Sequence, residues 1–189
     1  MTIVIYVISL LLAALLVVFV TLFFVFVLDS ILRGHDLPTS KQAIKALIKI
    51  IDRNKPSANN FYDLGCGRGT LLLAVKRKYP HLFVYGVDNN AIRIFFAKLK
   101  AALFKQKINF KKQDLFQIDL RNADIIYTYL WYDLMPPLEE KLQKEFKRGA
   151  IVITNTSKFP NWKPQEKYIT YSKISTMPDF ETLFVYVKE

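Results

Sequence analysis

The stretch FYDLGCGRGT, residues 61–70, decides the fold of this chain: a short apolar run contains an acid, and three glycines follow at every second position. The apolar run predicts a buried strand, and residues 70–78 behind the glycines predict a helix. Ligands of doubly wound α/β sheets bind at the carboxyl ends of the strands, at such a strand–turn–helix crossing. Gly65, Gly67 and Gly69 therefore predict a loop whose backbone a ligand approaches closely.

Strand and helix patterns alternate through most of the remaining sequence. We expect helices at about 40–52, 70–78, 90–104 and 138–146, and strands at 61–64, 82–88, 108–114, 123–130, 149–154, 167–172 and 182–188. No helix is expected between the last two strands, so they predict a C-terminal antiparallel hairpin. The fold class is therefore α/β, with a doubly wound, Rossmann-like sheet of seven strands.

The first 28 residues contain no Asp, Glu, Lys or Arg, and their only polar side chains carry hydroxyl groups. A membrane-spanning helix needs about 20 apolar residues, so this run is long enough. A secretory signal peptide would have a basic start, a shorter apolar core and a small-residue cleavage site, and none of these is clear. A buried core helix would need a much larger domain around it. We expect a retained transmembrane anchor, and hence the bilayer as a partner.

Positive charge dominates the rest of the chain. Residues 30–189 carry 27 basic and 15 acidic side chains, because Asp29 is the only charged residue before them, and their net charge is +12. Arg33, Lys41 and Lys45 follow the apolar run, so the positive-inside rule predicts a single-pass membrane protein with its C-terminal domain on the cytoplasmic face. A basic surface suits anionic lipids and, more weakly, nucleic acid.

Cysteine and histidine are scarce in this sequence. Cys66 is the only cysteine, so it cannot form an intramolecular disulfide, which fits a reducing compartment. Two histidines and one cysteine do not make a zinc-binding set, and we expect no metal.

Three acids stand at the ends of three successive predicted strands. Asp88 lies nineteen residues after Gly69, where a carboxylate reaches ribose hydroxyls. Asp63 would repel a pyrophosphate but attract a cationic ligand, and S-adenosylmethionine carries an ammonium and a sulfonium without any phosphate. Asp114 suits the adenine amino group. The alternative without a ligand is that Asp63 and Asp114 simply begin turns, as aspartate often does.

Several short motifs resemble those of known enzymes. DLGCGRG, VDNN and KKQDL resemble the first three motifs of class I, seven-strand methyltransferases, and the resemblance covers residues 39–189. LPTSKQAIKALIKII, ADIIYTYLWYDLMPPLEEKL and FPNWKP resemble a narrower, membrane-anchored family, the adenine nucleotide translocase and ATP synthase c-subunit lysine N-methyltransferases. This resemblance implies methyl transfer from S-adenosylmethionine to lysine side chains of a membrane protein.

The resemblance also implies domains and site residues. Residues 1–30 would be the transmembrane anchor, 31–52 a linker and a helix, and 53–189 the methyltransferase domain. The expected cofactor-binding residues are Thr39, Asp63, Gly65, Cys66, Gly67, Gly69, Asp88, Asn89, Asp114 and Leu115.

A lysine amine must be neutral to attack a methyl group, although its ordinary pKa is ~10.4. A desolvated, aromatic-lined channel lowers that pKa and holds the methylammonium product. We expect Tyr129, Trp131 and Tyr132 to line such a channel, and Asp133 to orient the amine or accept its proton. The alternative role for Trp131 and Tyr132 is packing in the core or at a helix cap. For Trp162 the sequence leaves two roles open, packing in the core and forming a wall of the substrate site.

Other functions stay open from the sequence. A methyltransferase for a lipid or small hydrophobic acceptor would also suit an anchor. A nucleic-acid enzyme is less expected, since the Asn-Pro-Pro-Tyr of amino-methylating DNA enzymes is absent. The Asp-x-x-Tyr of a second lysine-methylating group is not found at Asp133, which is followed by Leu-Met-Pro. A catalytically inactive binding module is disfavoured by the intact acids and glycines.

The predicted helix at 90–104 has two apolar stripes. One contains Phe95, Leu99 and Leu103, and the other contains Ile94 and Ala97, with basic residues between them. One stripe must face the sheet, while the other either rests on a bilayer surface or is covered by loops.

Overall fold

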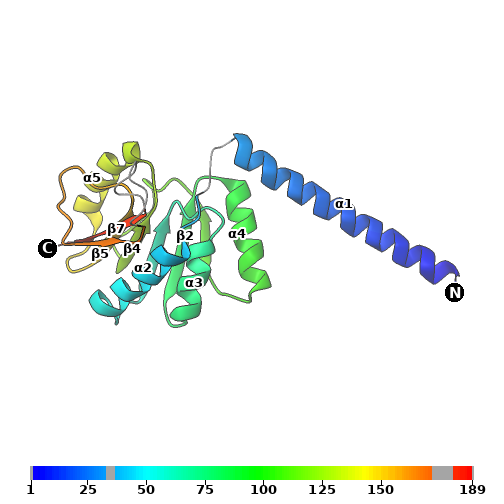
Figure 1. Ribbon diagram of the computed structural model, residues 1–189, viewed down its shortest axis with the longest axis horizontal. Helices are drawn as coiled ribbons and strands as arrows, with labels where there is room; N and C mark the ends of the chain where they lie inside the picture. Colours follow the sequence, from blue (N-terminus) through cyan, green and yellow to red (C-terminus); the bar gives the residue numbers. More distant parts are fainter. Residues whose placement is uncertain (1, 33–36, 172–180, 189) are drawn as a thin grey trace. The chain divides into compact units, whose positions relative to one another are not determined.

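The computed structural model describes residues 2–32, 37–171 and 181–188. Residues 33–36, inside the expected linker, and 172–180, between the last two predicted strands, lie outside the described part. The chain divides into two compact units, residues 1–37 and 38–189 (Figure 1). This division places the helix before the glycine loop in the second unit.

The first unit consists of α1 (Thr2–Leu32), a helix of 31 residues. At 1.5 Å per residue it extends over roughly 45 Å, compared with ~30 Å for the apolar core of a bilayer. The Thr21 hydroxyl donates to the Val17 carbonyl at 2.8 Å, so this polar group is satisfied within the helix. By length and composition, α1 can cross a membrane.

The second unit is built on a seven-stranded sheet with the order β3-β2-β1-β4-β5-β7-β6. Its strands are β1 (Asn60–Leu64), β2 (Phe83–Asp88), β3 (Asn109–Lys112), β4 (Ile125–Thr128), β5 (Ile151–Asn155), β6 (Glu166–Ile169) and β7 (Thr182–Val187). The first five run parallel, and β7 runs antiparallel to both β5 and β6. The predicted doubly wound sheet with its antiparallel strand pair is confirmed.

Four helices accompany the sheet: α2 (Lys41–Asn54), α3 (Thr70–Lys78), α4 (Ala91–Leu103) and α5 (Met135–Glu145). Helix α2 is capped by Ser40, whose hydroxyl accepts from the Ala43 N–H at 3.1 Å. Helix α5 begins earlier than the predicted residue 138, after a short 3₁₀ turn η1 (Tyr132–Leu134). Prolines occupy its first turn, where their missing N–H groups have no intrahelical partner to lose.

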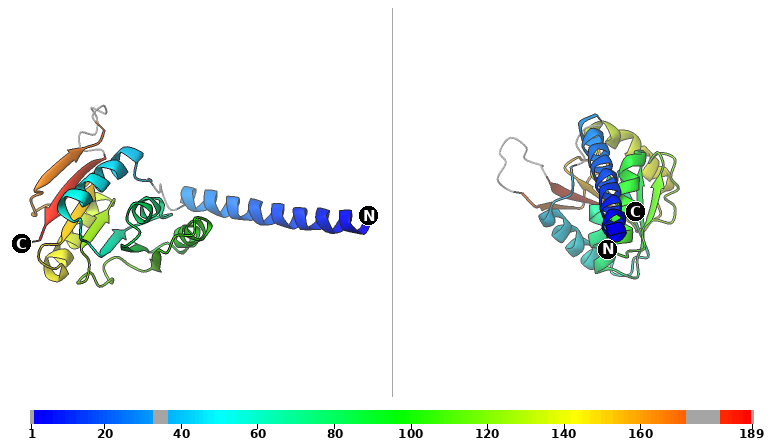
Figure 2. Two further views of the ribbon diagram at one scale, coloured as in Figure 1. Left: turned by 90° about the horizontal axis from the view of Figure 1, so that it is seen from below. Right: turned by 90° about the vertical axis from the view of Figure 1, so that its right-hand side faces the viewer.

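The two faces of the sheet have separate apolar cores. One face packs against α2, α3 and α4 through Leu47, Leu72 and Ile94. The opposite face packs against α5 through Leu138 and Leu142. Figure 2 shows α5, in yellow, on the side of the sheet opposite to α2, in cyan. Both layers leave the carboxyl ends of the parallel strands at one edge.

Asp124, just before β4, ties β1 to the strand beside it. Its carboxylate accepts from the Asn59 and Asn60 N–H groups, both at 2.8 Å, and pairs with Lys147. Burial raises the pKa of the Asp124 carboxyl, but Lys147 and the two N–H donors outweigh burial, and the pKa lies below its usual value. Its contribution to stability is therefore present above the unfolded pKa of ~3.9 and is lost as the pH falls through the folded pKa.

Replacing Asp124 by asparagine should lower the free energy of unfolding at neutral pH by about 1.5–3 kcal/mol, the range for hydrogen bonds to a charged group. The variant should also lose less stability than the parent protein on acidification. Urea denaturation at neutral and acidic pH measures both effects. Equal acid sensitivity of the two proteins would show that Asp124 does not contribute in this way.

Candidate active site

The glycine loop between β1 and α3 has a left-handed backbone at all three glycines. The φ angles are 83° at Gly65, 50° at Gly67 and 71° at Gly69. Side chains rarely adopt such angles, so glycine is required by conformation alone. The N–H groups of Gly65 and Cys66 donate to the Val87 carbonyl at 2.8 and 3.0 Å. The loop is therefore fixed to the end of β2.

Neighbouring side chains also exclude a Cβ atom from this loop. A Cβ on Gly65 would lie 2.7 Å from Leu130 Cδ2. A Cβ on Gly69 would lie 3.0 Å from the Phe110 ring and 3.2 Å from the Ala97 Cβ. The sequence interpretation, which explained the glycines by close approach of a ligand, was incomplete, because the protein itself occupies the space beside two of them.

Cys66 takes part in the loop through its backbone and through its thiol, which donates to the Gly67 carbonyl at 3.8 Å. Its side chain is buried in the apolar core on the α3 side of the sheet. A Cβ on Gly86 would come within 2.9 Å of the Cys66 Sγ. Gly86 therefore lets the loop pack closely on β2, a requirement that the sequence interpretation missed.

Asp88 is the buried acid at the end of β2. Its Oδ2 accepts from the Gly67 N–H at 2.9 Å, and its Oδ1 accepts from the Asn90 N–H at 2.8 Å. Carboxylate oxygens are the acceptors that ribose hydroxyls use at this position of doubly wound sheets. The Asn90 side chain in turn caps α4 by accepting from the Ile92 N–H at 2.9 Å. The predicted ribose-binding acid is thus held rigidly beside the glycine loop.

Asp63 lies buried on β1, where the register places it between Gly86 on β2 and Tyr127 on β4. The Tyr127 hydroxyl shares a hydrogen bond of 2.9 Å with the Thr39 hydroxyl and accepts from Asn155 Nδ2 at 3.0 Å. Thr39, expected at the cofactor site from the motif before β1, therefore reaches the edge of the sheet through Tyr127.

Tyr127 is surrounded by negative charge. Burial raises the pKa of its phenol well above the usual range, and the charges of Asp63 and Glu181 raise it further, against hydrogen bonds from Thr39 and Asn155. Tyr127 is 1% exposed. Both carboxylates therefore act on one buried hydroxyl in this edge of the sheet. Sequence analysis identified Asp63 but neither Tyr127 nor Glu181.

Glu181 precedes β7 and is 4% exposed. Its carboxylate accepts from the Ser40 N–H at 2.8 Å, and its own N–H donates to the Thr156 hydroxyl at 3.0 Å. Tyr129 is half-buried beside this pair. Burial raises the pKa of Tyr129, a hydrogen bond with Thr156 opposes the increase, and the charge of Glu181 adds to it. The structure thus brings the predicted Tyr129 together with an acid that the motifs did not indicate.

Trp131, Tyr132 and Asp133 follow β4 and are exposed. Trp131 is 68% exposed and Tyr132 is 78% exposed, so core packing is excluded for both. The sequence led us to expect an enclosed, desolvated channel, but no part of the chain that the structure describes encloses these two rings. The chain leaves the sheet after Thr128 and enters η1, which presents both rings to solvent.

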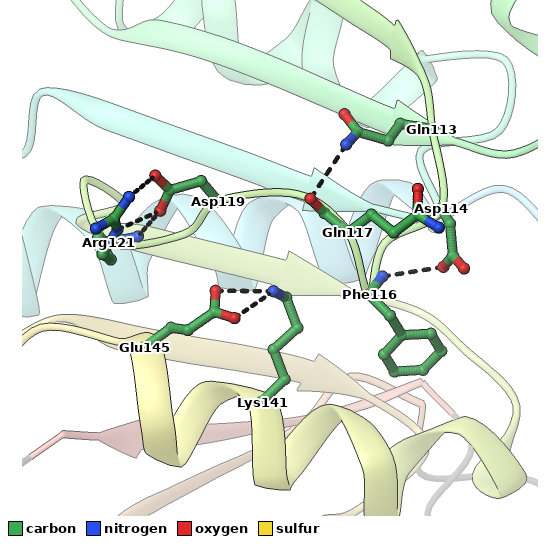
Figure 3. A network of polar contacts seen from close by, with 8 residues as sticks. All are labelled: Gln113, Asp114, Phe116, Gln117, Asp119, Arg121, Lys141 and Glu145. Carbon is green, nitrogen blue, oxygen red and sulfur yellow. Dashed lines mark hydrogen bonds and ion pairs between the residues drawn. The ribbon is translucent and has the colours of Figure 1, made fainter.

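The loop after β3, which contains Asp114, is held by hydrogen bonds between its own residues (Figure 3). The exposed Asp114 carboxylate accepts from the Phe116 N–H at 3.0 Å, as expected of an aspartate that begins a turn. Gln113 Nε2 donates to the Gln117 carbonyl at 3.1 Å. The predicted adenine contact of Asp114 stays a prediction. Leu115 packs partly against the α5-side core, and Asn89 is exposed.

Trp162, left between packing and a substrate wall, packs in the α5-side core. Its ring centroid lies 5.7 Å from that of Phe159 in a stacked arrangement, and 5.4 Å from that of Tyr186. It belongs to the apolar cluster on that face of the sheet.

The sequence profile of the ANTKMT methyltransferase domain matches residues 63–166. The chain belongs to this family. The matched range begins at Asp63 and includes the glycine loop, Asp88, Asp114 and the aromatic residues after β4. Membership makes the protein an S-adenosylmethionine-dependent methyltransferase, and the class and cofactor expected from the sequence are confirmed.

Curated relatives include a protein-lysine N-methyltransferase from Saccharolobus islandicus, 26% identical over 133 residues, which span 69% of this chain and 81% of the relative. A carboxy-S-adenosyl-L-methionine synthase from Nautilia profundicola is 30% identical over 165 residues, or 82% of this chain and 70% of the relative. The match to the corresponding synthase of Campylobacter lari spans 53% of that protein.

Solved structures share the fold at low identity. An RNA methyltransferase from Salinibacter ruber in complex with S-adenosyl-L-homocysteine superposes with a TM-score of 0.67 at 19% identity, covering 80% of this chain and 93% of that one. Magnesium protoporphyrin IX methyltransferase from Synechocystis, with S-adenosylmethionine bound, gives 0.62 at 14% identity, covering 78% and 79%.

The residues at this edge fit S-adenosylmethionine. Asp88 ends β2, where a carboxylate suits ribose hydroxyls, and the buried Asp63 carboxylate suits a cationic ligand better than a phosphate. Across residues 2–32, 37–171 and 181–188, no group of three His, Cys, Asp or Glu side chains is arranged to hold a metal ion. That the reaction needs no metal remains a prediction from the sequence.

Proposed function

We propose that this protein is a membrane-anchored protein-lysine N-methyltransferase whose acceptor is a lysine side chain of a membrane protein. The observation that carries the proposal is the pair of buried carboxylates, Asp63 and Glu181, whose charges both act on the buried Tyr127. The likeness to the lysine methyltransferase of Saccharolobus islandicus supports it.

The two carboxylates favour a cationic acceptor over an anionic one. They are nearly inaccessible to water, so their charges are weakly screened. The chain as a whole is strongly basic, with a formal net charge of +11, so these two acids stand in contrast to its overall charge. A lysine ammonium would therefore be attracted locally to this edge, and the methylammonium product would be stabilised there.

The chemistry requires little beyond orientation. When bound, S-adenosylmethionine supplies a methyl group already activated by the sulfonium, and the lysine nitrogen forms the new bond as the sulfur–carbon bond breaks. The amine first loses a proton to solvent. We assign Tyr129 to the wall of the acceptor site and Asp133 to orientation of the amine. The exposed rings of Trp131 and Tyr132 would contact the acceptor protein and exclude water when it binds.

The length and composition of α1 support membrane attachment. We propose that residues 1–30 form the anchor, that 31–52 contain a linker and α2, and that 53–189 form the methyltransferase domain. Basic residues follow the anchor, so the domain would lie on the cytoplasmic face. An enzyme held at this face can reach lysines at the ends of membrane-spanning segments.

The test is transfer of a labelled methyl group in native membranes. The full-length protein is incubated with membranes and S-adenosylmethionine labelled in its methyl group, and protein, lipid and nucleic acid are then separated. We expect the label in protein. Label confined to lipid or to nucleic acid would contradict the lysine proposal and leave the cofactor assignment intact.

The role of Glu181 has its own test. Glu181→Gln keeps an acceptor for the Ser40 N–H but removes the charge. We expect transfer to protein to fall at least about tenfold, roughly the 1.4 kcal/mol effect of one weakly screened charge, with unchanged affinity for S-adenosylmethionine. Glu140→Gln, at an exposed position on α5, is the matched control. Equal transfer by both variants would exclude an acceptor role for Glu181.

A further inference from the structure

Helix α4 buries one apolar stripe and exposes the other. Ile94, Ala97 and Ala101 are buried against the sheet. Phe95 and Leu99 repeat at a spacing of four and are 51% and 39% exposed. Leu103 continues the exposed stripe at 73% exposure, followed by Phe104 at 50%. The choice that the sequence left open is thereby resolved in favour of an outward stripe of large apolar side chains.

The segment of the chain that carries this stripe is basic. Between Asp88 and Asp114 the sequence contains no acidic residue and seven basic ones: Arg93, Lys98, Lys100, Lys105, Lys107, Lys111 and Lys112. They lie on α4, on the edge strand β3 and in the turn that joins them. The Arg77 guanidinium adds to them from α3, 4.9 Å from the centre of the Phe104 ring.

We propose that this α4 face, formed by Phe95, Leu99, Leu103 and the surrounding lysines, rests on the surface of an anionic lipid bilayer. An interfacial helix of this kind inserts its apolar side by about 5–10 Å, while basic residues contact the headgroup phosphates. Basic residues close to an anionic leaflet are attracted by its negative surface potential. The charge of the face is complementary to such a leaflet throughout.

A bilayer explains the face better than a nucleic acid does. Phosphate contacts account for the lysines in both cases. Bases stack on aromatic rings, but exposed leucines such as Leu99 and Leu103 offer them no stacking surface. The acyl boundary of a bilayer accommodates leucine and phenylalanine alike. The aliphatic part of the stripe therefore favours lipid.

Docking of this face would position the active-site edge. Helix α4 begins beside Asp88, since Asn90 is its cap and donates its N–H to that carboxylate. The helix is 13 residues long, or roughly 20 Å. With α4 on the bilayer, the carboxyl edge of the sheet lies close to the membrane surface, where a membrane protein presents its lysines. This inference goes beyond the proposed function, because it concerns lipid contact and does not depend on the acceptor.

Lipid contact can be measured on the full-length protein reconstituted into vesicles. An environment-sensitive fluorophore is attached at Leu99→Cys, with Lys144→Cys on the exposed side of α5 as the matched control. The native thiol of Cys66 is buried, which leaves the introduced cysteine as the reactive one. The vesicles contain phosphatidylcholine brominated in its acyl chains, with or without phosphatidylserine.

We expect bromine to quench the fluorophore at position 99, more strongly with phosphatidylserine, and to leave position 144 unquenched. Equal fluorescence at the two positions in anionic vesicles would overturn the proposal. Tight, salt-sensitive RNA binding that is lost in Lys98→Glu, without quenching at position 99, would assign the face to nucleic acid instead. Fluorescence quenching does not require methyl transfer. A negative result would therefore contradict the lipid-contact proposal and leave the lysine proposal untouched.

Discussion

Replacement of Asp88 by asparagine should weaken the binding of S-adenosylmethionine about 100-fold. The native carboxylate accepts from the N–H groups of Gly67 and Asn90, and it is the expected acceptor for the ribose hydroxyls. An asparagine amide nitrogen would face one of these donors with a donor of its own. Hydrogen bonds to a charged group contribute about 1.5–3 kcal/mol each, so loss of one to two of them gives this factor.

Equilibrium binding of the cofactor, by calorimetry on the detergent-solubilised protein, measures the effect. Asp119→Asn is the control, because Asp119 is an exposed acid that pairs with Arg121 in the loop before β4 (Figure 3). Its affinity should equal that of the parent protein. If Asp88→Asn also bound the cofactor normally, Asp88 would have no part in the ribose site.

Replacement of Gly69 by alanine should destabilise the protein by about 2–5 kcal/mol. A left-handed backbone costs a non-glycine residue about 1–2 kcal/mol, and overpacking adds about 1–3 kcal/mol. The added Cβ would lie 3.0 Å from the Phe110 ring and 3.2 Å from the Ala97 Cβ. Relief of these contacts would move the loop, so cofactor binding should weaken as well.

Gly149 provides a matched control for the packing contribution. Its φ of 74° is nearly that of Gly69, but a Cβ there would meet no atom within 4 Å. Gly149→Ala should therefore cost only about 1–2 kcal/mol and leave cofactor binding unchanged. Urea denaturation of both variants separates the cost of the left-handed backbone from the cost of the close contacts made by the added Cβ. Equal losses of stability would mean that Phe110 and Ala97 move aside freely.

The strand, the glycine loop and the following helix could be predicted because their signals are local. Residues 61–70 contain both the apolar run and the glycines, and the left-handed angles that require glycine belong to the same residues. Asp63 and Asp88 could be placed at one edge because carboxyl ends of parallel strands always share an edge.

Glu181 could not be placed in the site from the sequence. It reaches the carboxyl edge only because β7 inserts between β5 and β6 and runs antiparallel to both, so that its first residues lie beside the last residue of β5, Asn155. That pairing depends on contacts distant in sequence, and the predicted hairpin left the neighbours of β7 undetermined.

The exposure of Trp131 and Tyr132 was missed for a different reason. The prolines at 136 and 137 were interpreted as preceding a helix, whereas they form its first turn. The earlier start of α5 shortens the segment after β4 and converts part of it into η1. Aromatic residues expected to line a closed channel are consequently presented to solvent.

The central claim is methylation of lysine in a protein acceptor, and analysis of the product tests it most directly. Labelled membrane protein from the transfer reaction is hydrolysed to amino acids, and the labelled species is identified by chromatography against standards. We predict ε-N-methylated lysine, absent when Asp88→Asn replaces the parent enzyme. Label in another amino acid, or label released by mild base as from a methyl ester, would contradict the account.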